Sequence, residues 1–104
     1  MDSLLLELAQ KHAARYKVFG NARRLIILWI LSQGELSVNE IAAQTGSSIQ
    51  NISQHLHLLK QHCIVSNRRD GQTIYYRIQD RTDLEPWLDL LKMPEDLIKM
   101  NTYK

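Results

Sequence analysis

The sequence has a single cysteine, Cys63, so an intrachain disulfide is impossible and a disulfide-stapled secreted scaffold is excluded. Its longest apolar run, residues 25–31, has seven residues, whereas a membrane-spanning helix needs about twenty. No basic segment precedes Leu4, so we expect no secretory signal and a cytoplasmic location. Proline-rich, glycine-rich and repeated stretches are also lacking, which predicts one domain over residues 1–104.

Catalytic motifs are lacking as well. The chain has no glycine-rich phosphate loop, no nucleophile with a paired base and no regular spacing of metal ligands, so we expect no enzyme and no cofactor. The net charge is only +2, but residues 44–81 carry five basic side chains against two acidic ones, whereas residues 82–104 carry three against five. A basic middle followed by an acidic end favours a polyanionic partner for the middle. A charge-mixed solvated surface is the alternative.

The spacing of apolar residues predicts four helices before Cys63. Asn21 offers an N-cap to the second helix, which is apolar on most of its surface and must therefore be buried on several sides. Ser37 and Glu40 form a capping box at the start of the third. The predicted helices cover residues 3–18, 22–32, 38–44 and 48–62.

After Cys63 the pattern alternates, which predicts a β-hairpin with strands over 64–69 and 73–78. Asp70-Gly71 predicts a two-residue type I′ turn, which needs positive φ at both positions. A last helix is predicted over about 83–92, with a short helical tail. This order is a winged helix-turn-helix: mainly α, with about five helices and a two-stranded wing.

The fourth predicted helix carries side chains suited to reading DNA bases. No acidic residue occurs between Ser48 and His62. Asparagine and glutamine can bond adenine through two hydrogen bonds, and serine tolerates several bases. Arginines at the tip of the hairpin suit phosphates and a narrow minor groove. The predicted base-reading residues are Ser48, Gln50, Asn51, Ser53 and Gln54, and the predicted wing contacts are Arg68, Arg69 and Gln72.

Residues 19–28, 34–42, 52–59 and 65–76 follow, in one register, the pattern of a known family. Over these residues the sequence resembles the ArsR/SmtB family of dimeric winged-helix repressors. The resemblance implies a homodimer, an inverted-repeat operator in double-stranded DNA, and repression relieved by an inducer, commonly a metal ion. The inducer itself is not identified by the sequence.

The resemblance also implies particular site residues. It adds His55 to the base-reading face, and it places the dimer interface on the first and last helices, about 3–18 and 83–100. The family often has glycine where this chain has Cys63, which affects how the fourth helix is capped. The apolar residues that these two helices offer to a dimer interface are Leu5, Leu8, Tyr16, Leu84, Trp87, Leu88 and Leu91.

Both familiar metal sites of that family are missing. Members that sense arsenic or cadmium have cysteines in the third helix, where this chain has Ser37 and Asn39, which cannot supply thiolates. Members that sense zinc use histidines on the last helix, and no histidine follows His62. We therefore expect no metal ligands of either kind. The candidates left for another site are His12, His55, His57, His62 and Cys63, and a redox role for Cys63 is an alternative to a buried, inert thiol.

The sequence thus favours a dimeric, sequence-specific DNA-binding transcriptional regulator: a repressor without the usual metal ligands. The alternative is a winged-helix module that binds protein or RNA. Such a protein-binding module is expected to expose apolar or acidic side chains on its fourth helix. This chain has serine, glutamine and asparagine there instead, which favours DNA.

Overall fold

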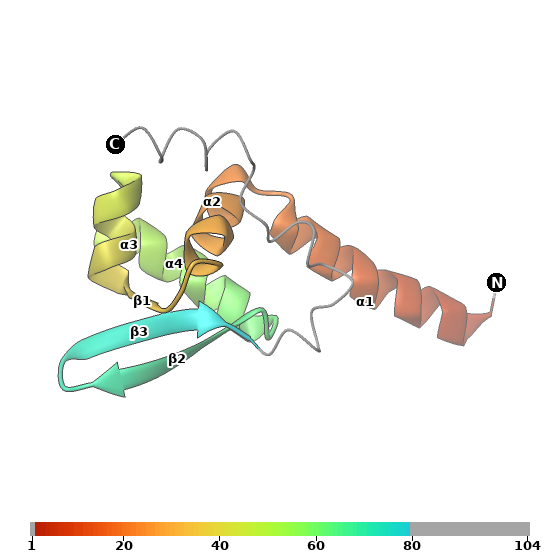
Figure 1. The fold of residues 1–104 in the computed structure, drawn as a ribbon. Helices are drawn as coiled ribbons and strands as arrows, with labels where there is room; N and C mark the ends of the chain where they lie inside the picture. The colour runs from red at the N-terminus through yellow and green to blue at the C-terminus, as the bar shows by residue number, and fades with distance from the viewer. Residues whose placement is uncertain (1, 80–104) are drawn as a thin grey trace.

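The computed structural model describes residues 2–79. They form a mainly helical winged helix-turn-helix with a small antiparallel sheet, as predicted (Figure 1). The predicted final helix at about 83–100, with Leu84, Trp87, Leu88 and Leu91, lies outside the described residues. The elements are α1 (Ser3–Phe19), α2 (Ala22–Leu31), β1 (Leu36–Ser37), α3 (Val38–Thr45), α4 (Ile49–Gln61), β2 (Val65–Asp70) and β3 (Thr73–Ile78).

The helix starts are set by local side chains, and all four predicted helices are confirmed to within about a residue. The side chains of Asn21 and Ser48 each accept a hydrogen bond of 3.1 Å from the backbone N–H three residues further on. Ser37 and Glu40 form the predicted capping box, with 3.1 Å in both directions. Gly46, at φ 69°, ends α3 in the left-handed conformation and lets the chain turn into α4.

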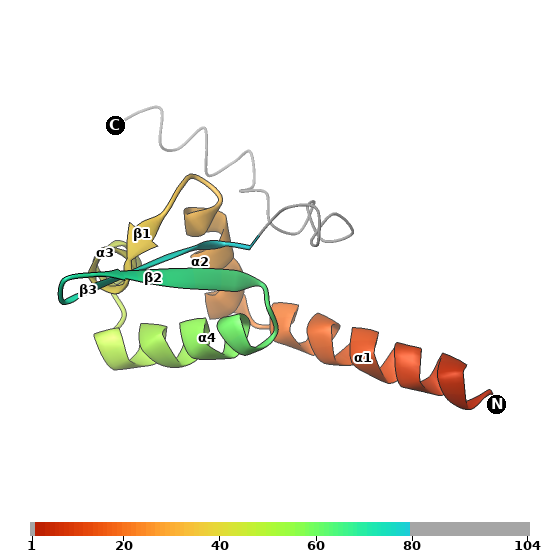
Figure 2. The same cartoon turned by 90° about the horizontal axis from the view of Figure 1, so that it is seen from below.

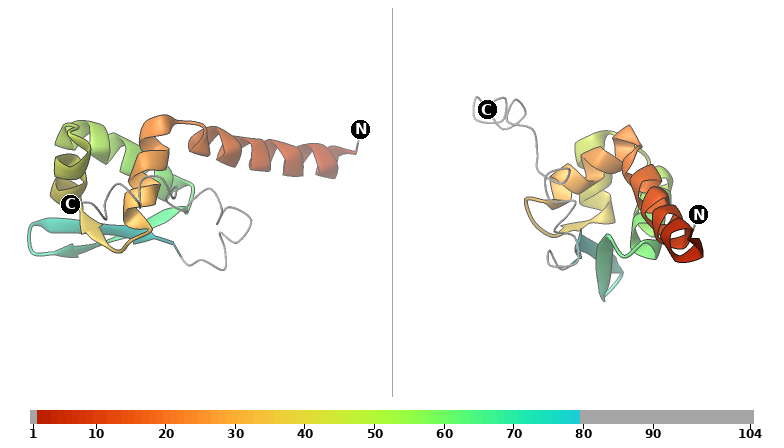
Figure 3. Two further views of the ribbon diagram at one scale, coloured as in Figure 1. Left: turned by 45° about the horizontal axis from the view of Figure 1, so that its top comes forward. Right: turned by 90° about the vertical axis from the view of Figure 1, so that its right-hand side faces the viewer.

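One apolar core joins α2, α3, α4 and the sheet. The first helix contributes only its last two residues to it and otherwise projects away from this body (Figures 1 and 3). The sheet lies beside α4 and carries β1 on its outer edge (Figure 2). The buried core residues are Val18, Phe19, Ile27, Leu28, Leu31, Ile41, Ala42, Ile52, Leu56, Leu59, Ile64, Val65 and Tyr76.

Two arginines fasten the C-terminal end of α1 to the rest of the fold. Arg24 Nε donates to the carbonyl oxygen of Val18 at 2.8 Å, and Arg15 Nη2 donates to the carbonyl oxygen of His62 at 3.3 Å. These oxygens lie at or beside the ends of α1 and α4, where backbone carbonyls lack helical partners. The first helix is therefore held at one end.

The sheet has three strands in the order β1-β3-β2, where the sequence predicted two. The extra strand pairs Leu36 with Tyr76 and Ser37 with Tyr75. A strand of two residues is too short to show any alternation of apolar and polar side chains, so no sequence pattern could have revealed it.

The turn of the hairpin lies one residue later than predicted. Asp70 pairs with Thr73, so the central residues are Gly71 and Gln72, and only Gly71 has a positive φ, of 63°. A positive φ at the first position alone is the pattern of a type II′ turn. The type I′ prediction was wrong because Gly71 stands at the first central position, where a type II′ turn requires glycine, and Asp70 is the last residue of β2 instead of part of the turn.

Cys63 occupies a position where helices usually have glycine. Its φ is 58°, the only positive φ of a non-glycine residue in the described part of the chain. Its N–H donates to the carbonyl of Lys60 at 3.0 Å, and the N–H of Ile64 donates to that of Leu59 at 3.0 Å. These two bonds form a Schellman motif, in which the left-handed residue carries a steric cost unless it is glycine. The thiol is exposed, so the expectation of a buried cysteine was wrong.

Replacing Cys63 with glycine should stabilise the fold, because it removes the clash of the Cβ atom in the left-handed conformation. We expect Cys63→Gly to raise the free energy of unfolding by about 1 kcal/mol, measured by urea denaturation. Cys63→Ser is the matched control, because it removes the thiol but keeps the Cβ atom, and it should stay near the wild type. Equal stability of the two variants would contradict this account of the α4 terminus.

Candidate nucleic-acid interface

The outer side of α4 is a continuous polar stripe. Its members recur at the spacing of one helix face and are all exposed, whereas the opposite side is buried in the core. Ile49, predicted on the apolar side, is instead 51% exposed in the first turn of the helix. The stripe consists of Gln50, Gln54, His57 and Gln61, and we call it the outer stripe of α4.

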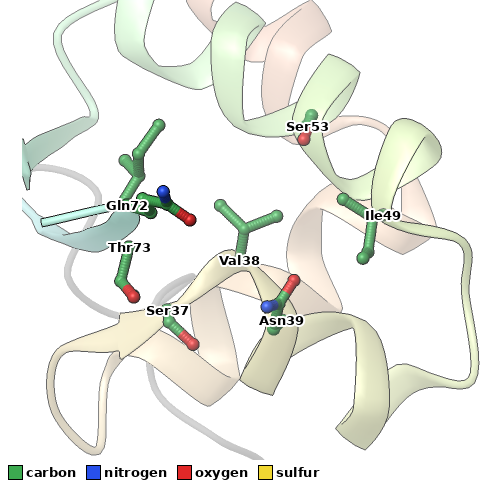
Figure 4. Close-up of a pocket in the computed structure, with 8 residues that line it drawn as sticks. Ser37, Val38, Asn39, Ile49, Ser53, Gln72 and Thr73 are labelled. Carbon is green, nitrogen blue, oxygen red and sulfur yellow. The ribbon is translucent and has the colours of Figure 1, made fainter.

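The wing borders one flank of this stripe. Ile49 and Ser53 of α4 line a groove of about 170 Å³ together with Gln72 and Thr73 of the hairpin. Figure 4 shows the amide of Gln72 pointing into this groove, toward Val38 at the start of α3. The predicted contacts Ser53 and Gln72 are therefore brought to one groove from elements far apart in the sequence.

The other flank of the stripe faces α2. Here Arg23 Nη1 donates a hydrogen bond of 3.1 Å to Oδ1 of Asn51. The bond turns the amide oxygen of Asn51 toward α2. A bidentate contact to adenine uses both the oxygen and the nitrogen of this amide. In such a contact, Oδ1 of Asn51 would accept hydrogen bonds from Arg23 and from the base together. Sequence reasoning missed Arg23, because its contact with Asn51 joins residues 28 positions apart.

His55 lies on the same flank, one helical turn after Asn51. It is partly buried, and burial lowers the pKa of its imidazole, which the positive charges of Arg24 and Arg23 lower further. The neutral form is thus favoured near neutral pH, and His55 adds no positive charge to this surface. The side chains of Ser48, Gln50 and Gln54 are exposed, as expected for base-reading residues.

The two adjacent arginines of the wing lie on opposite faces of the hairpin. Arg69 is paired across the strands with Ile74, which lines the groove next to α4. Arg68 is paired with Tyr75 on the other face, and its Cζ lies 4.5 Å from the centre of that ring. Side chains of neighbouring strand residues alternate in this way, so only Arg69 shares a face with the groove.

Arg68 is engaged by a carboxylate from outside the wing. Its Nη2 lies 2.6 Å from Oε1 of Glu35, and its Nε donates to Oε1 and Oε2 at 3.0 and 3.1 Å. The hydrogen bonds from Arg68 lower the pKa of Glu35, which favours the charged form of its carboxylate. Arg69 is exposed and forms no ion pair within residues 2–79.

The part of the chain that the structure describes offers no metal centre. Within residues 2–79 no group of three or more histidine, cysteine, aspartate or glutamate side chains could hold a metal ion. Ser37 is buried, and its Oγ accepts the N–H of Glu40 in the capping box. Among the same residues, no helix combines the length and the apolarity that crossing a membrane would require.

Comparison with known proteins gives one consistent result. Residues 21–66 match the model of the family described as bacterial regulatory protein, arsR family. The chain is 42% identical over 65 residues to the HTH-type transcriptional regulator KmtR of Mycobacterium tuberculosis, covering 62% of this chain and 50% of KmtR. It is 36% identical over 75 residues to the transcriptional activator HlyU of Vibrio cholerae, covering 72% of this chain and 68% of HlyU. The chain thus spans only half the length of KmtR.

Solved structures agree with the sequence matches. Reduced HlyU from Vibrio cholerae superposes with a TM-score of 0.74 at 31% identity, covering 86% of this chain and 94% of HlyU. A solution structure described as the homodimeric winged helix-turn-helix DNA-binding domain of Mb0332 from Mycobacterium bovis gives a TM-score of 0.71 at 36% identity. It covers 79% of this chain and 76% of that domain.

Proposed function

The chain belongs to the arsR family of bacterial regulatory proteins, which are transcriptional regulators and not enzymes, and on that premise we propose that it is a homodimeric, sequence-specific DNA-binding repressor. The observation that carries the proposal is the outer stripe of α4. It is free of acidic residues and is flanked by an exposed arginine on either side, Arg23 from α2 and Arg69 from the wing. A protein of this kind works in the cytoplasm, where an inverted-repeat operator in double-stranded DNA is its partner.

In the proposed complex α4 lies in the major groove and its N-terminal half contacts base edges. Gln50 and Gln54 are exposed and lie in that half of the stripe. Arg23 and Arg69 contact phosphates on either side, which fixes the orientation of the helix without reading sequence. The remaining proposed contacts are Ser48, Asn51, Ser53 and His55 on α4 and Gln72 at the wing tip.

The exposed leucines of α1 support a homodimer. Leu4 and Leu5 are 60% and 59% exposed, and Leu6 and Leu8 are 44% and 48% exposed, on a helix that projects from the body. An apolar patch of this kind is typical of an interaction site. We propose that it packs, together with Tyr16 and the residues predicted beyond the described part of the chain, against a second copy. The homodimeric state of the similar domain of Mb0332 agrees with this.

RNA or protein as the partner of α4 has less support. The major groove of double-stranded RNA is too deep and narrow to admit a helix, and the outer stripe of α4 offers amides rather than an apolar surface. The direction of regulation remains open to test, because the similar protein HlyU is named an activator. Genomic footprinting with the purified protein, followed by a reporter assay on the footprinted promoter, tests both points: no footprint would overturn DNA binding, and raised expression would overturn repression.

Substitutions on α4 and on the wing should affect binding in different ways. Gln50→Ala should reduce discrimination at one base pair by about 1–3 kcal/mol, because a direct base contact is lost. Arg69→Ala should weaken binding to all sequences and reduce the slope of log K against log salt by about 0.9, because one phosphate contact is lost. Fluorescence anisotropy over a series of operators and salt concentrations measures both. Gln61→Ala is the control at the far end of the stripe, and equal effects of all three variants would contradict the assignment.

The dimer should depend on the exposed leucines of α1. Leu5→Asp or Leu8→Asp should shift the protein toward monomer and lower operator affinity, because a charge would be buried in an apolar contact. Trp87→Ala, beyond the described residues, is expected to act in the same direction. Sedimentation equilibrium measures the shift, with Gln10→Asp as the control on the same helix. A wild type that stays monomeric at tens of micromolar and still binds a half-site tightly would rule this interface out.

The proposed repressor should bind arsenite, cadmium and zinc only weakly. Ser37 and Asn39 stand where the arsenic and cadmium sensors of the family have cysteines, and neutral oxygen ligands hold these ions poorly. Zinc sensors use histidines of the last helix, and residues 83–100 contain none. Calorimetric titration of the metal-free protein should therefore show no stoichiometric binding. Tight binding with nitrogen and sulfur ligands would refute the prediction and direct attention to His12, His62 and Cys63.

A further inference from the structure

The base of the wing is held by the core, in which Val65 and Tyr76 are buried, whereas its tip extends beyond that attachment. Its two strands pair with each other along their length, but β3 pairs with only two residues of β1, and the turn at Gly71 extends past that pairing. A hairpin alone is marginally stable in water, so the position of its tip relative to α4 has to be set by side chains. Among the described residues, the Glu35–Arg68 pair is the ion pair that ties the hairpin to the body.

The Glu35–Arg68 pair links β2 of the wing to the loop before β1, and we call this link the structural tie. Glu35 lies in the loop just before β1, and Arg68 lies in β2, on the far side of β3. The carboxylate engages Nε and Nη2 of the guanidinium together, and the ring of Tyr75 lies beneath its central carbon. The tie therefore spans all three strands. The guanidinium thus uses its Nε–H, one N–H of Nη2 and one face of its plane in this contact, and the carboxylate balances its positive charge.

Of the two adjacent arginines of β2, the same geometry leaves Arg69 as the available cation. It lies on the face that carries Ile74 and the groove beside α4, whereas Arg68 lies on the face with Tyr75. Ser53, on the flank of α4 beside the outer stripe, also lines this groove. Of the two arginines, Arg69 is thus on the side of the hairpin that the proposed DNA would approach.

We propose that Arg68 is a positioning residue, which holds the wing to the loop before β1 through Glu35, and that Arg69 supplies the phosphate contact of the wing. This inference rests on the proposed function, and it gives Arg68 a role different from the one that its sequence position suggested. Both arginines would matter for DNA binding, but for different physical reasons. Arg69 would act by its charge at the phosphate, and Arg68 by fixing where Arg69 and Gln72 lie.

Removing the charge of Glu35 separates the two roles, because they predict opposite effects. If Arg68 is a positioning residue, Glu35→Gln should weaken operator binding about two- to fivefold, the range typical of exposed ion pairs, and leave the salt slope unchanged. If Glu35 instead restrains a phosphate-binding Arg68, the same substitution should tighten binding and increase the slope by about 0.9, which would overturn the proposal. Glu7→Gln in α1 is the control for the change in net charge.

Exchanging the charges gives a second test. Arg68→Glu alone should weaken binding, and the double variant Glu35→Arg with Arg68→Glu should recover part of that loss, because the pair forms again with its charges reversed. A phosphate-contacting Arg68 predicts no recovery, since a glutamate on the wing would repel the DNA. Recovery supports the positioning role and its absence overturns it.

A measurement without DNA keeps this inference separate from the proposed function. Amide hydrogen exchange of residues 66–77 should become faster in Glu35→Gln and in Arg68→Gln than in the wild type or in Glu7→Gln. Unchanged exchange in both variants would overturn the tie even if the protein binds its operator. Conversely, if exchange is faster in the variants but the wild type gives no footprint on DNA, the proposed function is overturned and the structural tie is still supported.

Discussion

The burial of one side of α4 is the constraint on which the proposed interface depends. Ile52, Leu56 and Leu59 are at most 1% exposed and pack into the core shared with α2, α3 and the sheet. Because a helix is rigid and has a fixed period, burying these three positions also fixes the direction of every other side chain on it. The outer stripe is therefore held by the core rather than by its own contacts, and its polar residues are left available for a partner.

The helices and the polar, exposed side of α4 could be predicted from the sequence because their signals are local. The caps at Asn21, Ser37 and Ser48 each act within one helical turn, and the buried positions of α4 recur at helical spacing. The contacts from Arg23 to Asn51 and from Glu35 to Arg68 could not be predicted in this way, since they join residues 28 and 33 positions apart. The hairpin turn was predicted wrongly because Gly71 suits two turn types: it can be the second central residue of a type I′ turn after Asp70, or the first central residue of a type II′ turn before Gln72, as observed.

The arginines show why a count of charges along the sequence is an incomplete guide to a binding surface. Arg15 and Arg24 donate to backbone carbonyls and fasten α1, and Arg68 is neutralised by a glutamate from outside the basic stretch. Three guanidinium groups are thus engaged in holding the fold together. The charge of Arg68 is balanced by a carboxylate, whereas Arg15 and Arg24 keep their charge but are held in place by carbonyl oxygens. The exposed arginines Arg23 and Arg69 lie on the two sides of α4 that a polyanion would approach.

The attachment of α1 at one end has a mechanical consequence. A helix of 17 residues is about 25 Å long, so it acts as a lever arm about its junction with α2 at Gly20. A rotation of about 10° at that junction moves the far end by about 4 Å, which exceeds the separation of about 3.4 Å between successive base pairs. In a dimer formed through α1, a small change of angle at the junction would therefore be enough to take the two recognition helices out of step with the half-sites of an operator.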